Sequence, residues 1–268
     1  MGEERSRREA RSLKRVLALV EGQTEETFVR DVLAPHLEGH GVGVVPIVLA
    51  TKRIKSGGKF RGGVSSYQQF KRDLQRLLGD RSAAAITMML DYYGLPKDFP
   101  GAGTQRGHTC YDRATHLQES LQSDLQDRRL IPYLSLHEFE ALLFTSPETL
   151  AGTLLKPQVL RQLAAMVEGV ESPEEINDGA STHPSARIKR LLPTYSKSLH
   201  GPLIVQRIGL TEIRRHCPHF AWAGVARSRD LYGGCPAGRA GSADLRRQPL
   251  EVDEAAVQRQ LLLCTDDN

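Results

Sequence analysis

Two unbroken apolar runs, each ended by an acidic residue, constrain the fold of this chain most strongly. The runs are VLALV at 16–20, which ends at Glu21, and AAAITMML at 83–90, which ends at Asp91. Neither run alternates between apolar and polar residues, so we expect each strand to be buried on both faces, as in a parallel sheet covered by helices. The fold class predicted for the chain is therefore α/β with a mostly parallel sheet.

Strands and helices alternate through the first half of the chain. Further strands are predicted at 42–49 and 130–134, and helices from Glu25 onward, over 67–78 and over 111–127. We expect Thr24 to cap the first helix and Pro35 to kink it, because proline removes a helical hydrogen bond. Four such alternations indicate a parallel α/β sheet, in which ligands bind at the carboxyl ends of the strands.

Changes in composition divide the chain into four expected parts. They are a charged arm at 1–14, an α/β domain at 15–145, a mainly helical elaboration at 146–222, and a poorly ordered or variant tail at 223–268. The tail is expected to lack order because it is rich in Gly, Arg and Ala and has no clear period.

Charge, cysteine usage and hydropathy narrow the class of protein. A net charge of +4 and a sequence pI of about 8.9 permit a nucleic-acid partner without requiring one. The four cysteines are scattered without a CxxC pair, which argues against a disulfide framework or a zinc knuckle. No apolar run reaches the ~18 residues of a membrane span, and no secretory segment precedes the first strand. A cytoplasmic protein with no membrane partner is expected.

Three acidic residues are predicted to meet at the carboxyl edge of the sheet. Glu21 ends the first strand, Glu25 lies one helical turn further on, and Asp91 ends the third strand. Carboxylate oxygens are the ligands of hard divalent cations, and three crowded carboxylates repel each other unless a cation is present. We therefore predict that they bind Mg²⁺ or Mn²⁺. In the alternative, Glu25 and Glu26 only complement the helix dipole and Asp91 only opens a turn.

A second acidic segment, His137-Glu138-Phe139-Glu140, follows the fourth predicted strand. Glu138 and Glu140 are candidate ligands of a second metal ion, since two ions can stabilise both the attacking and the leaving oxygen in phosphodiester cleavage. The alternative is a helix start with acidic residues near its positive end. The segment is not HExxH, so zinc protease chemistry is not indicated.

Basic residues form two groups that suit a phosphate backbone, although a solvated surface would have the same composition. Lysine is also a candidate for stabilising transition-state charge, and Lys189 and Lys197 are the two residues considered for this role. The phosphate-binding pattern GxxxxGK[ST] is absent, which disfavours a small-molecule phosphotransfer enzyme. The groups comprise Lys52, Arg53, Lys55, Lys59 and Arg61 in a Gly-rich loop, and Arg187, Lys189, Arg190 and Lys197 further on.

Several segments together resemble the bacterial domain of unknown function 4276 family over roughly residues 15 to 222. They include VEGQTEETFV, MMLDYYGLPKDFPG, IPYLSLHEFEALLF, PEEIND, the stretch from Pro184 to Lys197, GPLIVQRIGLTEIR and CPHF. The resemblance implies a Toprim-like fold related to the nuclease halves of overcoming-lysogenization-defect proteins. It also implies an AAA or ABC-type ATPase partner and a link to defence against phage.

The same resemblance assigns roles to individual residues. The general Toprim pattern has a Glu after the first strand and Asp-x-Asp after the third, and Glu21 and Asp91 match it. Glu25 matches the extra Glu of the lysogenization-defect nucleases. Tyr93 stands where the second Asp is expected, so a second metal would need Glu138 or Glu140.

The function expected from these observations is a Mg²⁺-dependent, nuclease-like subunit that acts on DNA or RNA phosphodiesters. Glu21, Asp91, Glu140 and Lys189 are its candidate catalytic residues. Glu21, Glu25, Asp91, Glu138 and Glu140 are its candidate metal ligands. The alternative function is a non-catalytic regulatory or sensor subunit that binds an ATPase partner, and Tyr93 in place of an acid favours it.

Overall fold

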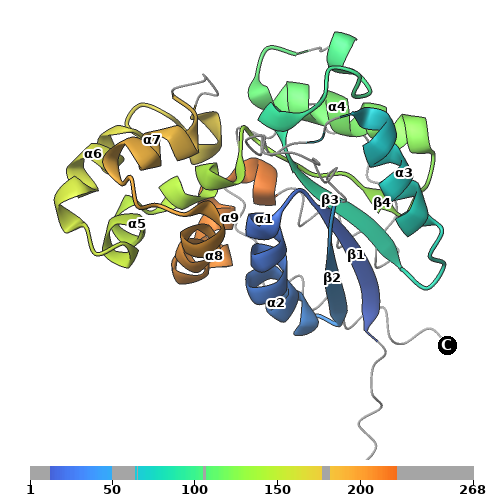
Figure 1. Ribbon diagram of the computed structural model, residues 1–268, viewed down its shortest axis with the longest axis horizontal. Coiled ribbons are helices and arrows are strands. Elements are labelled where there is room, and N and C mark those ends of the chain that lie inside the picture. Colours follow the sequence, from blue (N-terminus) through green and yellow to red (C-terminus); the bar gives the residue numbers. More distant parts are fainter. Residues whose placement is uncertain (1–12, 50–63, 65, 105–106, 177–181, 222–268) are drawn as a thin grey trace, which may run out of the picture.

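A parallel sheet flanked by helices forms the first part of the protein, as the apolar runs predict. The computed structural model describes residues 13–49, 64, 66–104, 107–176 and 182–221. The strand order is β2-β1-β3-β4, β5 also pairs with β3, and every strand pair is parallel (Figure 1). The strands are β1 (Lys14–Val20), β2 (Val42–Val48), β3 (Ala85–Asp91), β4 (Leu130–Ile131) and β5 (Leu134–Ser135).

The pairing register brings the strand-end acids to one edge of the sheet. Val20 pairs with Met89, so Glu21 follows this pair by one residue and Asp91 follows it by two. Asp91 in turn pairs with Ser135 of β5. The prediction that these strands are neighbours with their acidic ends together is therefore confirmed.

Helices cover both faces of the sheet, which explains why the strands carry no polar alternation. Side chains of β1 alternate between two cores, with Val16, Ala18 and Val20 in one and Leu17 and Leu19 in the other. The first core lies under α1 and α2, and the second lies under α3 and α4 (Figure 1). These helices are α1 (Gln23–Phe28), α2 (Ala34–Glu38), α3 (Tyr67–Leu78) and α4 (Cys110–Leu125).

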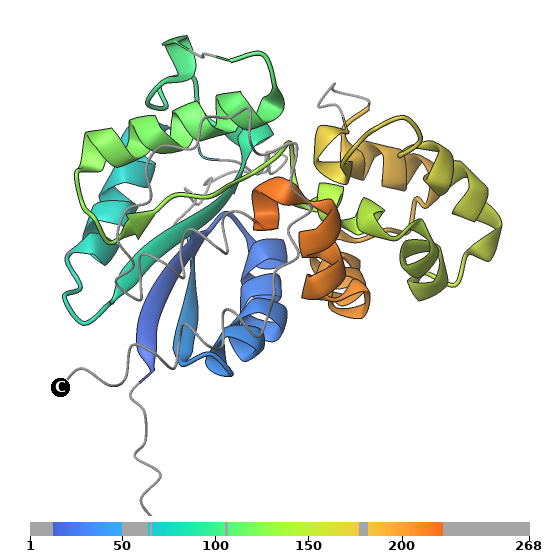
Figure 2. The ribbon, with the colours of Figure 1, turned by 180° about the vertical axis from the view of Figure 1, so that it is seen from behind.

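The chain after β5 is mainly helical and packs beside α1, as expected for 146–222 (Figure 2). Its helices are α5 (Pro147–Thr153), α6 (Leu160–Ala165), α7 (Pro184–Leu191), α8 (Lys197–Ile208) and α9 (Leu210–His216). Short 3₁₀ turns occur at Tyr92–Gly94, Ala102–Thr104, Phe139–Thr145, Pro157–Val159 and Pro173–Glu175. Within the described ranges, no helix is long and apolar enough to cross a membrane.

A buried carboxylate ties the end of the helical part to the rest of the fold. Glu174 is 1% exposed, and it accepts hydrogen bonds from the backbone N–H groups of His219 (2.8 Å) and Phe220 (2.9 Å). Burial raises the pKa of Glu174 to about 8. The His219 ring stacks on Tyr133 and its Nε2 lies 3.0 Å from the carbonyl oxygen of Leu134, so this contact reaches back to the sheet.

The first helix differs from the sequence prediction at its start. Gly22, and not Thr24, occupies the N-cap position, because the Glu25 carboxylate accepts the Gly22 N–H at 3.0 Å. Thr24 lies inside the helix and is buried. Pro35 disturbs the helix as predicted. A π-helical turn at Val29–Leu33 separates α1 from α2, just before the proline, which has no N–H to donate to the preceding turn.

The fourth predicted strand is wrong as a single element. Residues 130–134 form β4 and the start of β5, separated by Pro132 and Tyr133. Proline has no N–H to donate and interrupts a strand that is otherwise apolar. Both pieces still pair with β3, so the acidic segment after β5 keeps its expected place at the sheet edge.

Several expected features fall partly or wholly outside the described residues. The arm predicted at 1–14 is described only from Leu13, and Lys14 already belongs to β1. The tail predicted at 223–268 lies outside them entirely, as do Lys52, Arg53, Lys55, Lys59 and Arg61 of the basic loop. Of the four cysteines, Cys110 and Cys217 are described, and both are free.

Candidate metal and phosphodiester site

The carboxylates of Glu21, Glu25 and Asp91 come together where β1 and β3 end. A Glu21 carboxylate oxygen accepts the backbone N–H of Asp91 at 3.3 Å. Glu25, one turn into α1, points back to the Gly22 N–H, and Asp91 Oδ1 accepts the Phe139 N–H at 3.0 Å. The edge therefore gathers the three acids that the sequence singles out.

Burial and mutual repulsion raise the pKa values of all three acids. Burial is the largest cause for Glu21 and for Glu25, and repulsion from Glu21 adds to it at Glu25. The pKa of Asp91 is raised well above its ordinary value by burial and then by the charges of Glu21, Glu25 and Glu140. Because these acids repel one another when they are ionised, a bound cation would stabilise their charged forms.

Lys197, the first residue of α8, lies among the acids. Its Nζ donates to Glu138 Oε2 at 2.8 Å and to Glu140 Oε2 at 3.0 Å. Burial lowers the pKa of Lys197, but attraction to Glu140 and Glu138 outweighs it and the net shift is upward. One lysine thus balances part of the negative charge and stays protonated.

Glu140 is the most enclosed acid of the segment after β5. It is 1% exposed, and besides Lys197 it contacts the Tyr195 hydroxyl at 3.4 Å. Burial raises the pKa of Glu140 to about 7. The charge of Glu140 also raises the pKa of Asp91, so Glu140 lies near the acids of the sheet edge.

Glu138 contacts the start of α7 as well as Lys197, which distinguishes it from Glu140. Its Oε1 accepts from the backbone N–H of Ser185 and lies 3.0 Å from His183 Nδ1, while its Oε2 accepts from Ser185 Oγ at 3.0 Å and from Lys197. Burial alone would raise its pKa, but Lys197 and these hydrogen bonds hold it below the ordinary value. An anionic carboxylate with about four acceptor positions already engaged has little capacity left for a metal ion. Glu138 therefore anchors the start of α7 to the site.

Lys189, one of the two candidate lysines, is not at the acid cluster. It is exposed in the last turn of α7, whose inward face carries Pro184, Ser185 and Ile188. Its helical position turns it away from that buried face, and among the described residues it makes no ion pair with the acids. Of the two candidate lysines, Lys197 is the one that lies at the acid cluster.

The donor chemistry of the cluster suits a hard divalent cation, although its side chains do not form a closed cage. Within the described ranges, no three His, Cys, Asp or Glu side chains are arranged to hold one ion as they stand. Glu21, Glu25 and Asp91 each accept one backbone N–H, which leaves carboxylate lone pairs for a metal ion or its waters. Mg²⁺ needs only one or two protein carboxylates, with waters filling the other positions.

Ser135 adds a further oxygen at the same edge. It is the register partner of Asp91, so the two side chains lie on the same face of neighbouring strands. Its hydroxyl is buried and has no hydrogen-bond partner in the described part of the chain. An unmatched buried hydroxyl beside a cluster of acids fits a site completed by an ion or its water.

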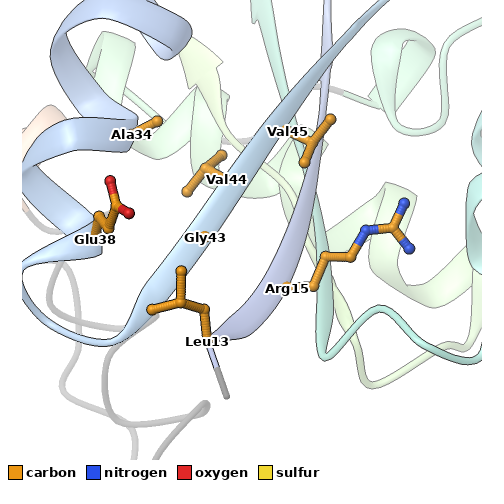
Figure 3. A pocket seen from close by; sticks show the side chains of 7 residues that line it. All are labelled: Leu13, Arg15, Ala34, Glu38, Gly43, Val44 and Val45. Atoms are coloured by element: carbon orange, nitrogen blue, oxygen red, sulfur yellow. The ribbon is translucent and has the colours of Figure 1, made fainter. Parts of the chain in front are cut away.

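One hollow on the described surface lies away from this chemistry. It has a volume of about 360 Å³ and is shallow, and it is lined by residues of α2 and of the starting ends of β1 and β2 (Figure 3). Arg15 and Glu38 are its charged lining residues, among mostly apolar or small ones. It holds no clustered acids, and we assign it no part in the site.

Four residues near the acids were not predicted from the sequence. They are Ser135, which is the strand partner of Asp91, and His183, Ser185 and Tyr195, which tertiary packing brings to the glutamates. His183, Ser185 and Tyr195 lie 45 to 55 residues along the chain from the glutamates that they contact. The resemblance of the segment from Pro184 to Lys197 is the signal that could have pointed to this region.

Comparison with known proteins supports the family seen in the motifs. No curated protein and no solved structure matches the chain. A family model described as "Domain of unknown function (DUF4276)" matches residues 20–222, which is most of the chain and contains every acid of the site. The chain therefore belongs to the DUF4276 family of domains of unknown function.

Proposed function

We propose that this protein is a Mg²⁺-dependent, nuclease-like subunit that acts on nucleic-acid phosphodiesters. The observation that carries the proposal is the burial of Asp91 among Glu21, Glu25 and Glu140 at the carboxyl edge of a parallel sheet, with Lys197 beside them. Acids with raised pKa values cluster at sites that bind cations or move protons, and here they gather at the edge of the sheet where ligands bind in parallel α/β folds.

The proposed ligands are Asp91 and Glu21, with Glu25 and Glu140 completing the shell directly or through water. A bound Mg²⁺ or Mn²⁺ would polarise the phosphate and lower the pKa of a bound water. Asp91 is the common neighbour of the other three acids, so it is the ligand whose loss should matter most. Glu138 is left out of the ligand set, because its oxygens are engaged by Lys197, His183 and Ser185.

Lys197 is proposed to stabilise the negative charge that develops on the phosphate. It is protonated, and its Nζ is held at the acid cluster by two carboxylates. A preorganised donor of this kind acts without reorganisation as charge develops. Glu140, with a pKa of about 7, can accept or release a proton near neutral pH at a position beside Lys197.

Cleavage of labelled DNA and RNA by the purified protein in Mg²⁺ and in Mn²⁺ tests the proposal. We expect cleavage by the wild type and its loss in Asp91→Asn, which keeps an oxygen to accept the Phe139 N–H. A matched pair is available in α1, where Glu25→Gln should reduce activity and Glu26→Gln, the next residue, should not. Wild-type protein that cleaves neither nucleic acid, or an Asp91→Asn variant of full activity, would contradict the proposal.

A regulatory or sensor subunit is the second candidate. The specific observation in its favour is the hydrogen bonding of Glu138 and Glu140 with Lys197, His183 and Tyr195, which would equally serve a purely structural ion pair. Under this proposal Mg²⁺ would not bind, and Asp91→Asn would leave association with an ATPase partner unchanged.

The wider setting rests on the resemblance in the motifs. A Toprim-like relation to the lysogenization-defect nucleases would make Glu21, Glu25 and Asp91 the equivalents of their metal-binding acids. The same relation suggests an AAA or ABC-type ATPase partner and a role in defence against phage. Co-purification with an ATPase encoded next to this protein is the direct test of the partner.

A further inference from the structure

Tyr93 is an exposed aromatic ring at the rim of the acid cluster. It is 52% exposed and follows the buried Asp91 by two residues. Its backbone N–H donates to the carbonyl oxygen of His137 at 3.2 Å, which fixes the turn that carries it. An exposed aromatic ring is therefore held two residues from an acid of the site.

The His183 ring stacks against the Tyr93 ring. The two rings are stacked, with centroids 5.9 Å apart and an interplanar angle of 25°. His183 is itself held, because its Nδ1 lies 3.0 Å from Glu138 Oε1 and 3.2 Å from Ser185 Oγ. The pair therefore forms a supported aromatic surface whose remaining exposed area is available to another flat group.

The helix that starts beside this surface carries basic side chains. His183 is the N-cap of α7, and Lys189 and Arg190 are exposed in its last turn. Along the helix axis these residues lie about 10 Å from His183. An aromatic ring with basic side chains a short distance away is the arrangement by which proteins hold single-stranded nucleic acid, through base stacking and contacts to phosphates.

We propose that Tyr93, backed by His183, stacks on a base of single-stranded nucleic acid, with Lys189 and Arg190 contacting the adjacent backbone. The inference deepens the proposed function, on which it rests, by giving the substrate class as single-stranded or locally unpaired nucleic acid. In a duplex both faces of each base are already stacked, so only an unpaired base can offer a face to Tyr93.

The test is binding of labelled single-stranded and duplex oligonucleotides of one sequence, measured by fluorescence anisotropy with Ca²⁺ in place of Mg²⁺. The oligonucleotides are checked for integrity after the measurement. The variants are Tyr93→Ala, Tyr93→Phe and, as a matched loss of exposed apolar surface far along the chain, Leu155→Ala, since Leu155 is 83% exposed. A single-stranded oligonucleotide containing 2-aminopurine reports stacking directly through quenching of its fluorescence.

We expect the wild type to prefer the single strand and to quench 2-aminopurine. Tyr93→Ala should weaken single-strand binding about 5- to 100-fold and abolish the quenching, because stacking on one aromatic ring contributes on this scale. Tyr93→Phe should retain both properties, and Leu155→Ala should match the wild type. Circular dichroism checks that each variant is folded.

Three outcomes would overturn the inference. They are wild-type protein that binds no oligonucleotide, a preference for duplex, and a Tyr93→Ala variant that binds the single strand as well as the wild type does. Because binding is measured without cleavage, the two proposals can fail separately. Stacking that depends on Tyr93 without Mg²⁺-dependent cleavage would refute only the nuclease, and cleavage that survives Tyr93→Ala with unchanged single-strand affinity would refute only the stacking.

Discussion

Replacing Glu140 with glutamine is expected to stabilise the protein, but only above the pH at which this glutamate ionises in the unfolded chain. Burial raises the pKa of Glu140 from 4.5 to about 7. The folded state therefore keeps this proton to a higher pH than the unfolded state does. Stability is then lost as pH rises from about 4.5 to about 7, which is the opposite of the usual behaviour of a salt-bridged acid.

The size of the effect follows from the same shift. At about 1.4 kcal/mol per pH unit, moving the pKa from 4.5 to about 7 corresponds to about 3 kcal/mol of folding free energy above pH 7. Glutamine resembles the protonated acid in shape and avoids this cost. The attraction of Lys197, which opposes the shift, is already contained in the net value. Removing the charge also relieves Asp91, so coupling acts in the same direction.

Urea unfolding followed by circular dichroism, in a chelator, measures the effect at about pH 4 and about pH 8.5. Glu140→Gln should match the wild type at the lower pH and exceed it by up to about 3 kcal/mol at the higher, or by about 6–12 °C in Tm. Glu148→Gln, a change at an exposed glutamate in α5, should show no such difference. A Glu140→Gln variant that is less stable at both pH values, or equally changed at both, would refute this account of the site.

Three further predictions concern the metal, the lysine and the anchor of the helical part. Adding Mg²⁺ or Mn²⁺ above pH 7 should raise the stability of the wild type, by about 2.7 kcal/mol at a hundred times Kd, and calorimetry should find this binding abolished in Asp91→Asn. Lys197→Met should lower the free energy of unfolding in urea by about 2–3 kcal/mol. This is less than the loss expected for a fully buried ion-pair partner, because the Lys197 side chain is 36% exposed. Lys189→Met, the control, should leave the free energy of unfolding unchanged. Glu174→Ala should cost about 2–5 kcal/mol by the same measurement, because two buried N–H groups lose their acceptor; a Glu174→Ala cost below that of an exposed substitution would contradict the anchoring role.

The sheet and its acidic edge could be predicted because their signals are local. An apolar run without alternation needs cover on both faces, and acids after two such runs must share an edge if the strands are parallel neighbours. The contact between Glu21 and the Asp91 backbone bears this out. The break between β4 and β5 was also readable, since Pro132 lies inside the predicted strand.

The choice between Lys189 and Lys197 could not be made in the same way. Both residues lie in a helical region where sequence separation says little about distance from the sheet. The contact between α1 and α8 decides the matter, and it depends on tertiary packing rather than on any local period. The contacts of His183 and Ser185 with Glu138 have the same origin, because they join the sheet edge to a helix 45 to 47 residues away in sequence.

The placement of Lys197 also sets an order of events while the chain is being made. Asp91 leaves the ribosome 106 residues before Lys197 does, by their positions in the sequence. At about 5–20 residues per second, Asp91 waits about 5–20 s for its counter-charge, and Glu21 and Glu25 wait longer. During that interval the nascent sheet can form, but its acidic edge stays solvated or protonated. Closure of the site is therefore a late step of biosynthesis, and a chain that stops before α8 would keep the acids without the lysine that balances them.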